Sequence, residues 1–153
     1  MVVRAVIRVN CRKGRKMEAT TIKQVILYRR DLKMRKGKIA AQVAHASLKV
    51  LLDRAAPVAG SANTIQIALT PAMAQWTRVS FTKVVLSVED ESALLRAYEE
   101  ARRRGIPCAL ITDSGRTEFH GQPTMTTVAI GPDDAAAIDE ITGREGMVET
   151  RLA

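Results

Sequence analysis

Short apolar runs alternate with longer amphipathic segments along most of the chain. Several runs are rich in β-branched residues and too short for buried helices, so they predict strands that are covered on both faces. The predicted strands lie at residues 23–29, 81–88, 107–112 and 124–130. Apolar positions spaced every three or four residues predict helices instead. The predicted helices lie at residues 38–54, 89–104 and 132–142, with a further short helix after Pro71.

This order of elements predicts the fold class. Strands that alternate with helices form a largely parallel sheet with helices on both faces, and the direct step between the last two strands requires one antiparallel neighbour. We therefore expect a three-layer α/β/α sandwich around a mixed, mostly parallel sheet of about four strands. Ligands in such sheets bind outside the carboxyl ends of the strands. That rule directs attention to two loops, at residues 30–37 and 113–122.

Length and composition limit the classes of protein that fit. The chain has 153 residues, of which 46% are hydrophobic, enough for one core, and we expect the folded domain to span residues 22–153. No apolar stretch approaches the roughly 18 residues of a membrane helix, so no membrane association is expected. The two cysteines, Cys11 and Cys108, form no metal-binding or disulfide pattern. We expect a soluble protein of the cytoplasm.

Positive charge is concentrated at the N-terminus. The formal net charge is +8, and residues 1–16 carry +6 of it without one acidic side chain. Residues 1–21 form a basic extension for which three interpretations stay open. The extension is an arm for nucleic acid, a targeting segment, or sequence upstream of a true start at Met17.

A polar stripe runs along the first predicted helix. At about 100° per residue, Lys38, Gln42, His45 and Lys49 fall within a narrow arc that apolar residues flank on both sides. This arrangement favours a stripe that lines a groove, although a packed or surface-exposed histidine is the commoner case. Lys38 lies in the first helical turn, where backbone N–H groups favour an anion. The preceding loop lacks the glycine and hydroxyl positions of a nucleotide-binding P-loop.

The second loop also carries candidate chemistry. Residues 113–117 place a carboxylate, a glycine, a guanidinium and a hydroxyl directly after a predicted strand. A carboxylate can orient a water molecule, and an arginine can bind phosphate. The Asp-Ser-Gly sequence is equally ordinary turn chemistry, and this segment alone favours a turn.

Three segments together resemble a known family. Residues 29–46 (RRDLKMRKGKIAAQVAHA), 111–117 (ITDSGRT) and 126–132 (TTVAIGP) resemble, in the same order, the motifs of the type 2 peptidyl-tRNA hydrolases of archaea and eukaryotes. The similarity extends from about residue 23 to residue 143. It implies an α/β sandwich with a mixed sheet, and an enzyme that cleaves the ester between a peptide and the terminal ribose of tRNA, which recycles tRNA from aborted translation.

The resemblance also implies site residues. The family's functional positions correspond to Lys38, Gln42, His45, Asp113, Thr117 and Thr126. Our hypothesis is that Asp113, with His45 or Thr117, positions a water molecule while Lys38 and a helical N–H stabilise the oxyanion. Neither a metal ion nor another cofactor is expected.

Basic residues around the two loops complete the expected site. We expect sequence-independent binding of tRNA phosphates by these side chains. They are Arg29, Lys33, Arg35, Lys36 and Arg116. The oligomeric state is left open, with a homodimer as one candidate. Two other functions also remain: a tRNA- or anion-binding module without catalysis, and an interaction protein whose N-terminal extension is the functional part.

Overall fold

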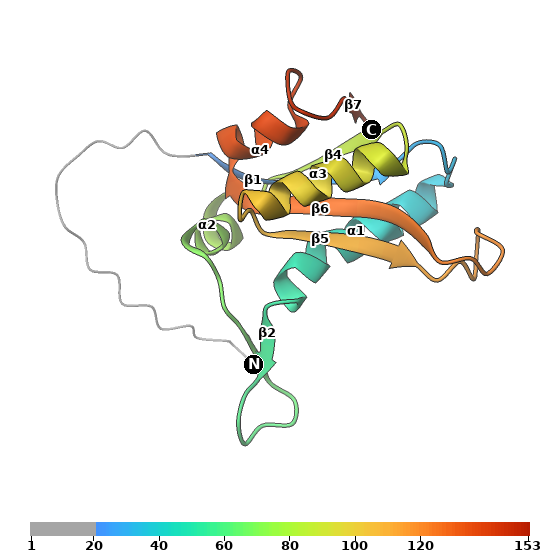
Figure 1. Cartoon of the computed structure of the whole chain (residues 1–153). Coiled ribbons are helices and arrows are strands. Elements are labelled where there is room, and N and C mark those ends of the chain that lie inside the picture. Colours follow the sequence, from blue (N-terminus) through green and yellow to red (C-terminus); the bar gives the residue numbers. More distant parts are fainter. Residues whose placement is uncertain (1–20) are drawn as a thin grey trace.

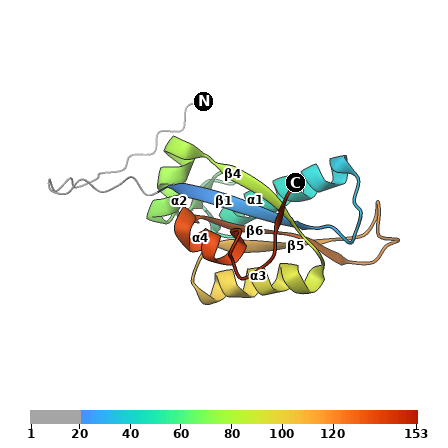
Figure 2. The same ribbon diagram turned by 90° about the horizontal axis from the view of Figure 1, so that it is seen from above.

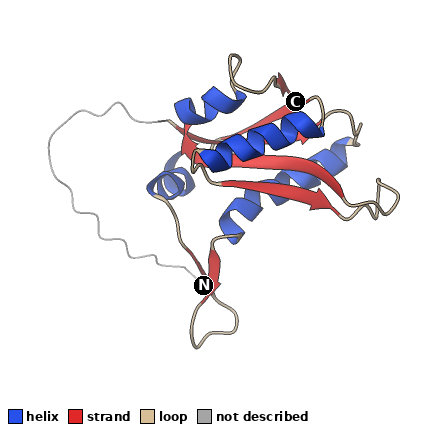
Figure 3. Ribbon diagram, in the orientation of Figure 1, coloured by secondary structure: helices blue, strands red, loops and turns tan. Residues whose placement is uncertain are grey.

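A central five-stranded sheet organises the described part of the chain, residues 21–153, in the computed structural model. The strand order is β5-β6-β1-β4-β7 (Figures 1 and 3). The strands of this sheet are β1 (Ile22–Arg29), β4 (Lys83–Val88), β5 (Cys108–Asp113), β6 (Thr124–Asp134) and β7 (Arg151–Leu152). The interpretations of residues 1–20 concern a segment outside the described residues.

The sheet is mixed, as predicted, but parallel pairs are fewer than expected. Only β1 and β4 pair in parallel, and the other three pairings are antiparallel. The expectation of a mostly parallel sheet is corrected for a topological reason: β6 inserts between β1 and β5 and runs opposite to both. Because β1, β4 and β5 still point in one direction, their carboxyl ends share one edge of the sheet.

Helices cover both faces of the sheet, which confirms the three-layer architecture (Figure 2). The helices are α1 (Lys36–Leu52), α2 (Pro71–Gln75), α3 (Glu91–Arg103) and α4 (Ala135–Thr142), with a π-helical turn η1 (Trp76–Ser80) after α2. Side chains of β1 alternate between two apolar clusters, as a strand buried on both faces requires. Val25 and Leu27 pack with α3 and α4, whereas Ile26 packs with Ala46 and Val50 of α1.

The last helix begins later than its proline suggested. Proline is common at the first helical position, and for this reason the sequence predicts a helix that begins at Pro132. In the structure Asp133 and Asp134 still pair with β1, and α4 starts at Ala135. The Asp134 carboxylate caps it by accepting a hydrogen bond of 2.7 Å from the backbone N–H of Ala136.

Two small elements had no sequence prediction. A hairpin of β2 (Ala55–Pro57) and β3 (Ile65–Ile67) projects from the end of α1 (Figure 1), and β7 adds two residues beside β4. Both are too short to show a period of two. Between residues 21 and 153, no helix combines the length and apolar character needed to cross a membrane.

Candidate active site

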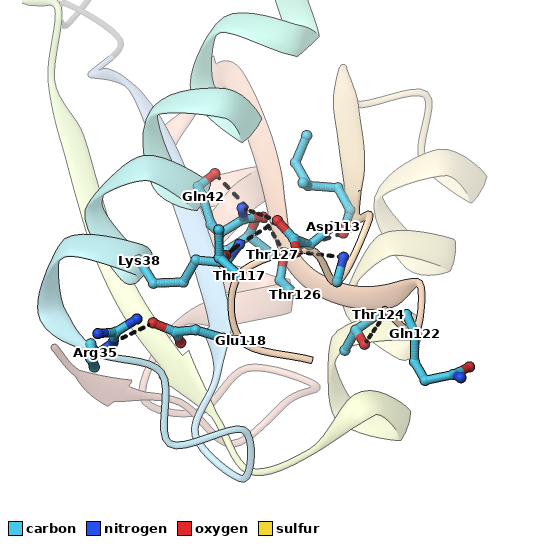
Figure 4. A network of polar contacts seen from close by, with 12 residues as sticks. Arg35, Lys38, Gln42, Asp113, Thr117, Glu118, Gln122, Thr124, Thr126 and Thr127 are labelled. Carbon is cyan, nitrogen blue, oxygen red and sulfur yellow. Dashed lines mark hydrogen bonds and ion pairs between the residues drawn. The ribbon is translucent and has the colours of Figure 1, made fainter. Parts of the chain in front are cut away.

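The two loops identified from the sequence meet at one edge of the sheet. Lys38 belongs to the first turn of α1, and Asp113 is the last residue of β5. The Lys38 ammonium donates to Asp113 Oδ2 at 2.5 Å and to Thr117 Oγ1 at 3.1 Å (Figure 4). Only 11% and 12% of the Lys38 and Asp113 side chains are exposed. The ion pair is therefore shielded from bulk water on most sides.

Three donors surround the Asp113 carboxylate. Besides Lys38, Gln42 Nε2 donates to Oδ2 at 2.8 Å, and the backbone N–H of Gly115 donates to Oδ1 at 2.9 Å. The hydrogen bond from Lys38 is the largest cause that lowers the pKa of Asp113 below its ordinary value of 3.8, and it outweighs the opposing effect of burial. Asp113 is thus a carboxylate anion at neutral pH.

Gln42 connects Asp113 to β6. Its side chain is 2% exposed, and its Oε1 accepts a hydrogen bond of 2.6 Å from the Thr126 hydroxyl (Figure 4). The amide therefore has one orientation that satisfies both neighbours, with its oxygen toward Thr126 and its nitrogen toward Asp113. This buried chain of hydrogen bonds fixes the direction from which Gln42 approaches the carboxylate.

An irregularity in the sheet brings two consecutive threonines to the same side. Ile111 pairs with Thr127 and Thr112 with Met125, so no residue of β5 lies opposite Thr126 in the strand register. Such a bulge lets neighbouring side chains on the bulged strand face one way. The Thr126 hydroxyl contacts the Gln42 side chain, and the Thr127 hydroxyl donates to the Gln42 backbone carbonyl at 3.2 Å. The sequence prediction had no sign of this bulge beyond the Thr-Thr pair itself.

The polar stripe of α1 divides into two parts. Lys38 and Gln42 contact Asp113, whereas the Lys49 ammonium pairs with Asp53 at 2.7 Å, one turn further on. His45 is exposed and makes no hydrogen bond or ion pair within residues 21–153. It does line a cavity of about 540 Å³ together with Lys38, Gln42, Asp113 and Thr117. Space for a substrate is therefore present beside the Lys38–Asp113 pair.

Arg29 occupies a different position from the other basic residues. Its side chain is buried, and its guanidinium donates to Asp31, to Glu91 at 2.5 Å and to the Met125 carbonyl at 3.0 Å. The bond to Arg29 lowers the pKa of Asp31. With these acceptors satisfied, Arg29 ties β1 to its neighbours and has little capacity left for a phosphate. We therefore assign it to the fold, contrary to the expected phosphate contact.

The remaining basic side chains lie at the surface, and Arg35 is the one of these four that lines the cavity. Arg35 is 79% exposed and pairs with Glu118 at 2.7 Å, which joins the loop before α1 to the loop after β5 (Figure 4). Lys33, Lys36 and Arg116 are exposed. Sequence reasoning missed Glu118 and also Phe119, whose ring centre lies 5.5 Å from the Lys38 ammonium. Neither residue stands out in a pattern of strands and helices.

Residues 21–153 contain no set of side chains suited to bind a metal ion. No group of three or more histidine, cysteine, aspartate or glutamate side chains within this range is arranged to hold a metal ion. The site's polar groups are an ammonium, a carboxylate, an amide and hydroxyls (Figure 4). These groups can orient a water molecule and stabilise a negatively charged oxygen.

Comparison with known proteins identifies the family. The sequence profile of peptidyl-tRNA hydrolase PTH2 matches residues 22–145, most of the chain. The chain belongs to the PTH2 family. This family member is similar to peptidyl-tRNA hydrolases of three archaea. It shares 42% identity with that of Methanopyrus kandleri over 79% of this chain and 93% of the relative. The identity with the enzyme of Haloquadratum walsbyi is 41%, over 80% of this chain and 96% of the relative. The identity with that of Methanocaldococcus jannaschii is 39%, over 80% of this chain and 96% of the relative.

The PTH2 match contains every residue of the polar cluster. Lys38, Gln42, Asp113, Thr117 and Thr126 all lie within residues 22–145 and come together although they belong to a helix, two strands and a loop. The sequence motifs that resemble the family therefore meet at one site in the structure.

Proposed function

We propose that this PTH2 family member hydrolyses the ester that joins a peptide, or an N-blocked amino acid, to the terminal ribose of tRNA, and thereby recycles tRNA from aborted translation. The family membership supports this reaction, and three archaeal relatives carry the name peptidyl-tRNA hydrolase. The observation that carries the proposal is the shielded Lys38–Asp113 pair on the wall of a cavity.

The proposed chemistry uses protein groups alone. A water oxygen bonds to the ester carbonyl carbon, the bond to the ribose oxygen breaks, and the products are a peptide carboxylate, the tRNA hydroxyl and one proton. Asp113 accepts a hydrogen bond from the attacking water and so orients it. Because its pKa is lowered, the carboxylate stays ionised and is a weak base, so its proposed role is to hold the water rather than to take its proton. Lys38 stabilises the negative charge that develops on the carbonyl oxygen.

Two further side chains have proposed roles in the same cavity. The Thr117 hydroxyl already accepts from Lys38, which leaves its own hydrogen for a substrate oxygen. His45 lines the cavity without contacting Asp113, so its proposed role is contact with the substrate or with the water's outgoing proton. Gln42, supported by Thr126, is proposed to position the carboxylate.

Binding of the tRNA is proposed to rest on phosphates. Exposed Lys33, Lys36 and Arg116, with Arg35 beside them, present positive charge around the site. Lysine and arginine that displace counterions from phosphates give an affinity that falls as salt rises. A cytoplasmic location is proposed with this function.

The test is release of the amino acid from tRNA. Purified protein is mixed with N-acetyl-aminoacyl-tRNA, and unblocked aminoacyl-tRNA serves as a substrate control. We expect cleavage of the blocked substrate alone. Asp113→Asn should lower kcat/KM by about 100-fold or more, on the scale of a misplaced reacting group. Asp53→Asn changes an exposed carboxylate at the C-terminal end of α1, away from the cavity, and should leave kcat/KM within about twofold.

Two outcomes would contradict the proposal. Salt-sensitive tRNA binding without cleavage would indicate the non-catalytic binding module. Cleavage that survives Asp113→Asn in full would show that the reaction occurs elsewhere on the protein.

A further inference from the structure

The outward face of α1 is unusually apolar. Gly37, Ala41, Ala44 and Leu48 point away from the sheet, within about 60° of one another at 100° per residue, and all four are exposed. A surface helix normally carries charged or polar side chains on this face. On α1 the ridge that faces solvent instead has small side chains and one exposed leucine, 54% accessible.

The ridge separates two depressions. On one side lies the cavity with Lys38 and Asp113. On the other side lies a groove of about 970 Å³ between α1, β1, β4 and η1. Its apolar walls include Ile39, Val43, Leu51, Trp76, Phe81 and Val85. Ala41 lines the first depression, while Ala40 and Ala44 line the second, so only the width of the helix lies between them.

The groove leaves apolar surface in contact with water. Phe81 is 59% accessible and stacks at 4.4 Å on the buried Trp76. The Lys83 ammonium lies 3.2 Å from the centre of the Phe81 ring, so this cation is already engaged with the aromatic wall. A contiguous apolar surface of this kind marks a binding site, and the volume suits several amino-acid side chains.

We propose that this groove binds apolar side chains of the peptide in peptidyl-tRNA; the proposal rests on the proposed function. With the ester held at Lys38 and Asp113, the peptide must leave the cavity, and the ridge of small side chains lets an extended backbone cross α1. The helix is about 10 Å wide, and an extended chain covers about 3.3 Å per residue. About three residues cross the ridge, so the fourth to sixth residues from the ester reach the groove.

The chemistry of the two sides favours a peptide as the occupant. Ala40 of the groove and Ala41 of the cavity are neighbours on α1, so the groove lies directly beside the cavity in which we propose that the ester binds. The tRNA carries a phosphate in every nucleotide and is matched by the exposed basic loops rather than by an apolar wall. A peptide supplies both a slim backbone for the ridge and apolar side chains for the groove.

The experiment compares two N-acetyl-hexapeptidyl-tRNAs. They differ only at the fourth to sixth residues from the ester, which are leucines in one substrate and serines in the other. For the wild-type protein we expect the ratio of kcat/KM, leucine substrate over serine substrate, to be at least about tenfold, since burial of even one leucine is worth that factor. Leu48→Glu and Ala44→Glu should bring the ratio close to one, because a carboxylate on the ridge opposes apolar burial.

A matched control separates the groove from general effects of a surface charge. Ala136→Glu introduces the same carboxylate at an exposed position of α4, on the opposite face of the sheet, and should keep the wild-type ratio. A wild-type ratio near one, or a ratio unchanged by both ridge variants, overturns the proposal while the cleavage of both substrates still supports the hydrolase. Cleavage of neither substrate overturns both proposals.

A second copy of the chain is the competing occupant. The molar mass of the wild-type protein and of Leu48→Glu is measured by light scattering. A dimer that this substitution converts to monomers would show that another copy covers the groove, and it would overturn the peptide site. A mass that Leu48→Glu leaves unchanged, together with the loss of the substrate ratio, supports the peptide site.

Discussion

Lys38 is the main cause of the lowered pKa of Asp113. Replacing the ammonium by a thioether of similar length, Lys38→Met, removes the strongest donor and leaves burial as an opposing cause, so the pKa of Asp113 should rise. The carboxyl ¹³C resonance followed through a pH titration measures this change directly. Lys49→Met, which removes a partner from the exposed Asp53, is the matched control and should leave the Asp113 titration where it is.

The sign of the stability effect follows from the same shift. A carboxyl group whose pKa is lower in the folded protein stabilises the fold above its unfolded pKa of about 4, and this stabilisation is lost as the pH falls through the folded value. The wild-type protein should therefore lose more of its free energy of unfolding below pH 4 than Lys38→Met does. Equal acid sensitivity of the two proteins would show that the pair contributes no such coupling.

Thr126 is the residue at which positioning and stability can be measured together. Thr126→Val keeps the shape but removes the donor to buried Gln42 Oε1, and an unsatisfied buried acceptor costs about 1–3 kcal/mol. Because Gln42 would then be free to reorient, we also expect kcat to fall with little change in KM. Urea unfolding and single-turnover hydrolysis measure the two effects.

A neighbouring threonine provides the control for this substitution. The Thr124 hydroxyl donates only to the Gln122 carbonyl in the loop, so Thr124→Val should change both quantities little. If Thr126→Val behaved like Thr124→Val, the hydrogen bonds from β6 through Gln42 to Asp113 would contribute neither to the free energy of unfolding nor to kcat.

At the scale of an element, the loop after β5 depends on the backbone at Gly115. Its φ is +81°, and a Cβ there would lie 2.4 Å from the Gln122 carbonyl oxygen. Gly115→Ala must therefore displace the backbone that donates to Asp113, and we expect kcat/KM to fall by about tenfold or more.

Gly121 separates the close contact from the cost of the left-handed conformation. Its φ is +78°, but nothing lies within 4 Å of an added Cβ. Gly121→Ala should thus cost about 1–2 kcal/mol of stability, as an alanine in that conformation does, while hydrolysis is retained. Equal losses of activity in the two variants would indicate that loop strain alone matters and that the Gly115 N–H does not.

Elements with a clear period were predictable, and those set by tertiary contacts were not. The runs around Val25 and Val128 are apolar because both faces of their strands are covered, and this pattern is present in the sequence alone. The hairpin of β2 and β3 has three residues in each strand, too few for any period. The position of β6 between β1 and β5 depends on which edges pair, which no local pattern encodes.

The candidate site shows the same division. Lys38, Gln42 and Asp113 could be predicted to meet, because helix position and strand ends determine where they lie. The pairing of buried Arg29 with the partly exposed carboxylates of Asp31 and Glu91 could not be predicted, since Glu91 is 62 residues away in the sequence. A basic residue next to a loop is available to a ligand only when the fold leaves it without internal partners.

Across the whole molecule, catalysis and attraction of tRNA should be separable. The contacts of the polar cluster all lie between residues 38 and 126, whereas +6 of the +8 net charge belongs to residues 1–16. A chain that begins at Met17 should therefore keep its kcat within about twofold. Its tRNA affinity should still fall with salt, because basic residues around the site remain.

The slope of log affinity against log salt then distinguishes the interpretations of the N-terminal extension. Each lost phosphate contact makes the slope less negative by about 0.9, so a reduced slope in the shortened chain would identify a nucleic-acid-binding arm. An unchanged slope would favour a targeting segment or sequence upstream of the true start. A full-length variant with the six basic residues of this segment replaced by glutamine controls for length.

If hydrolysis vanished in the shortened chain although its circular dichroism matched the full-length protein, the function would reside in the extension, and residues 22–153 would serve as its scaffold.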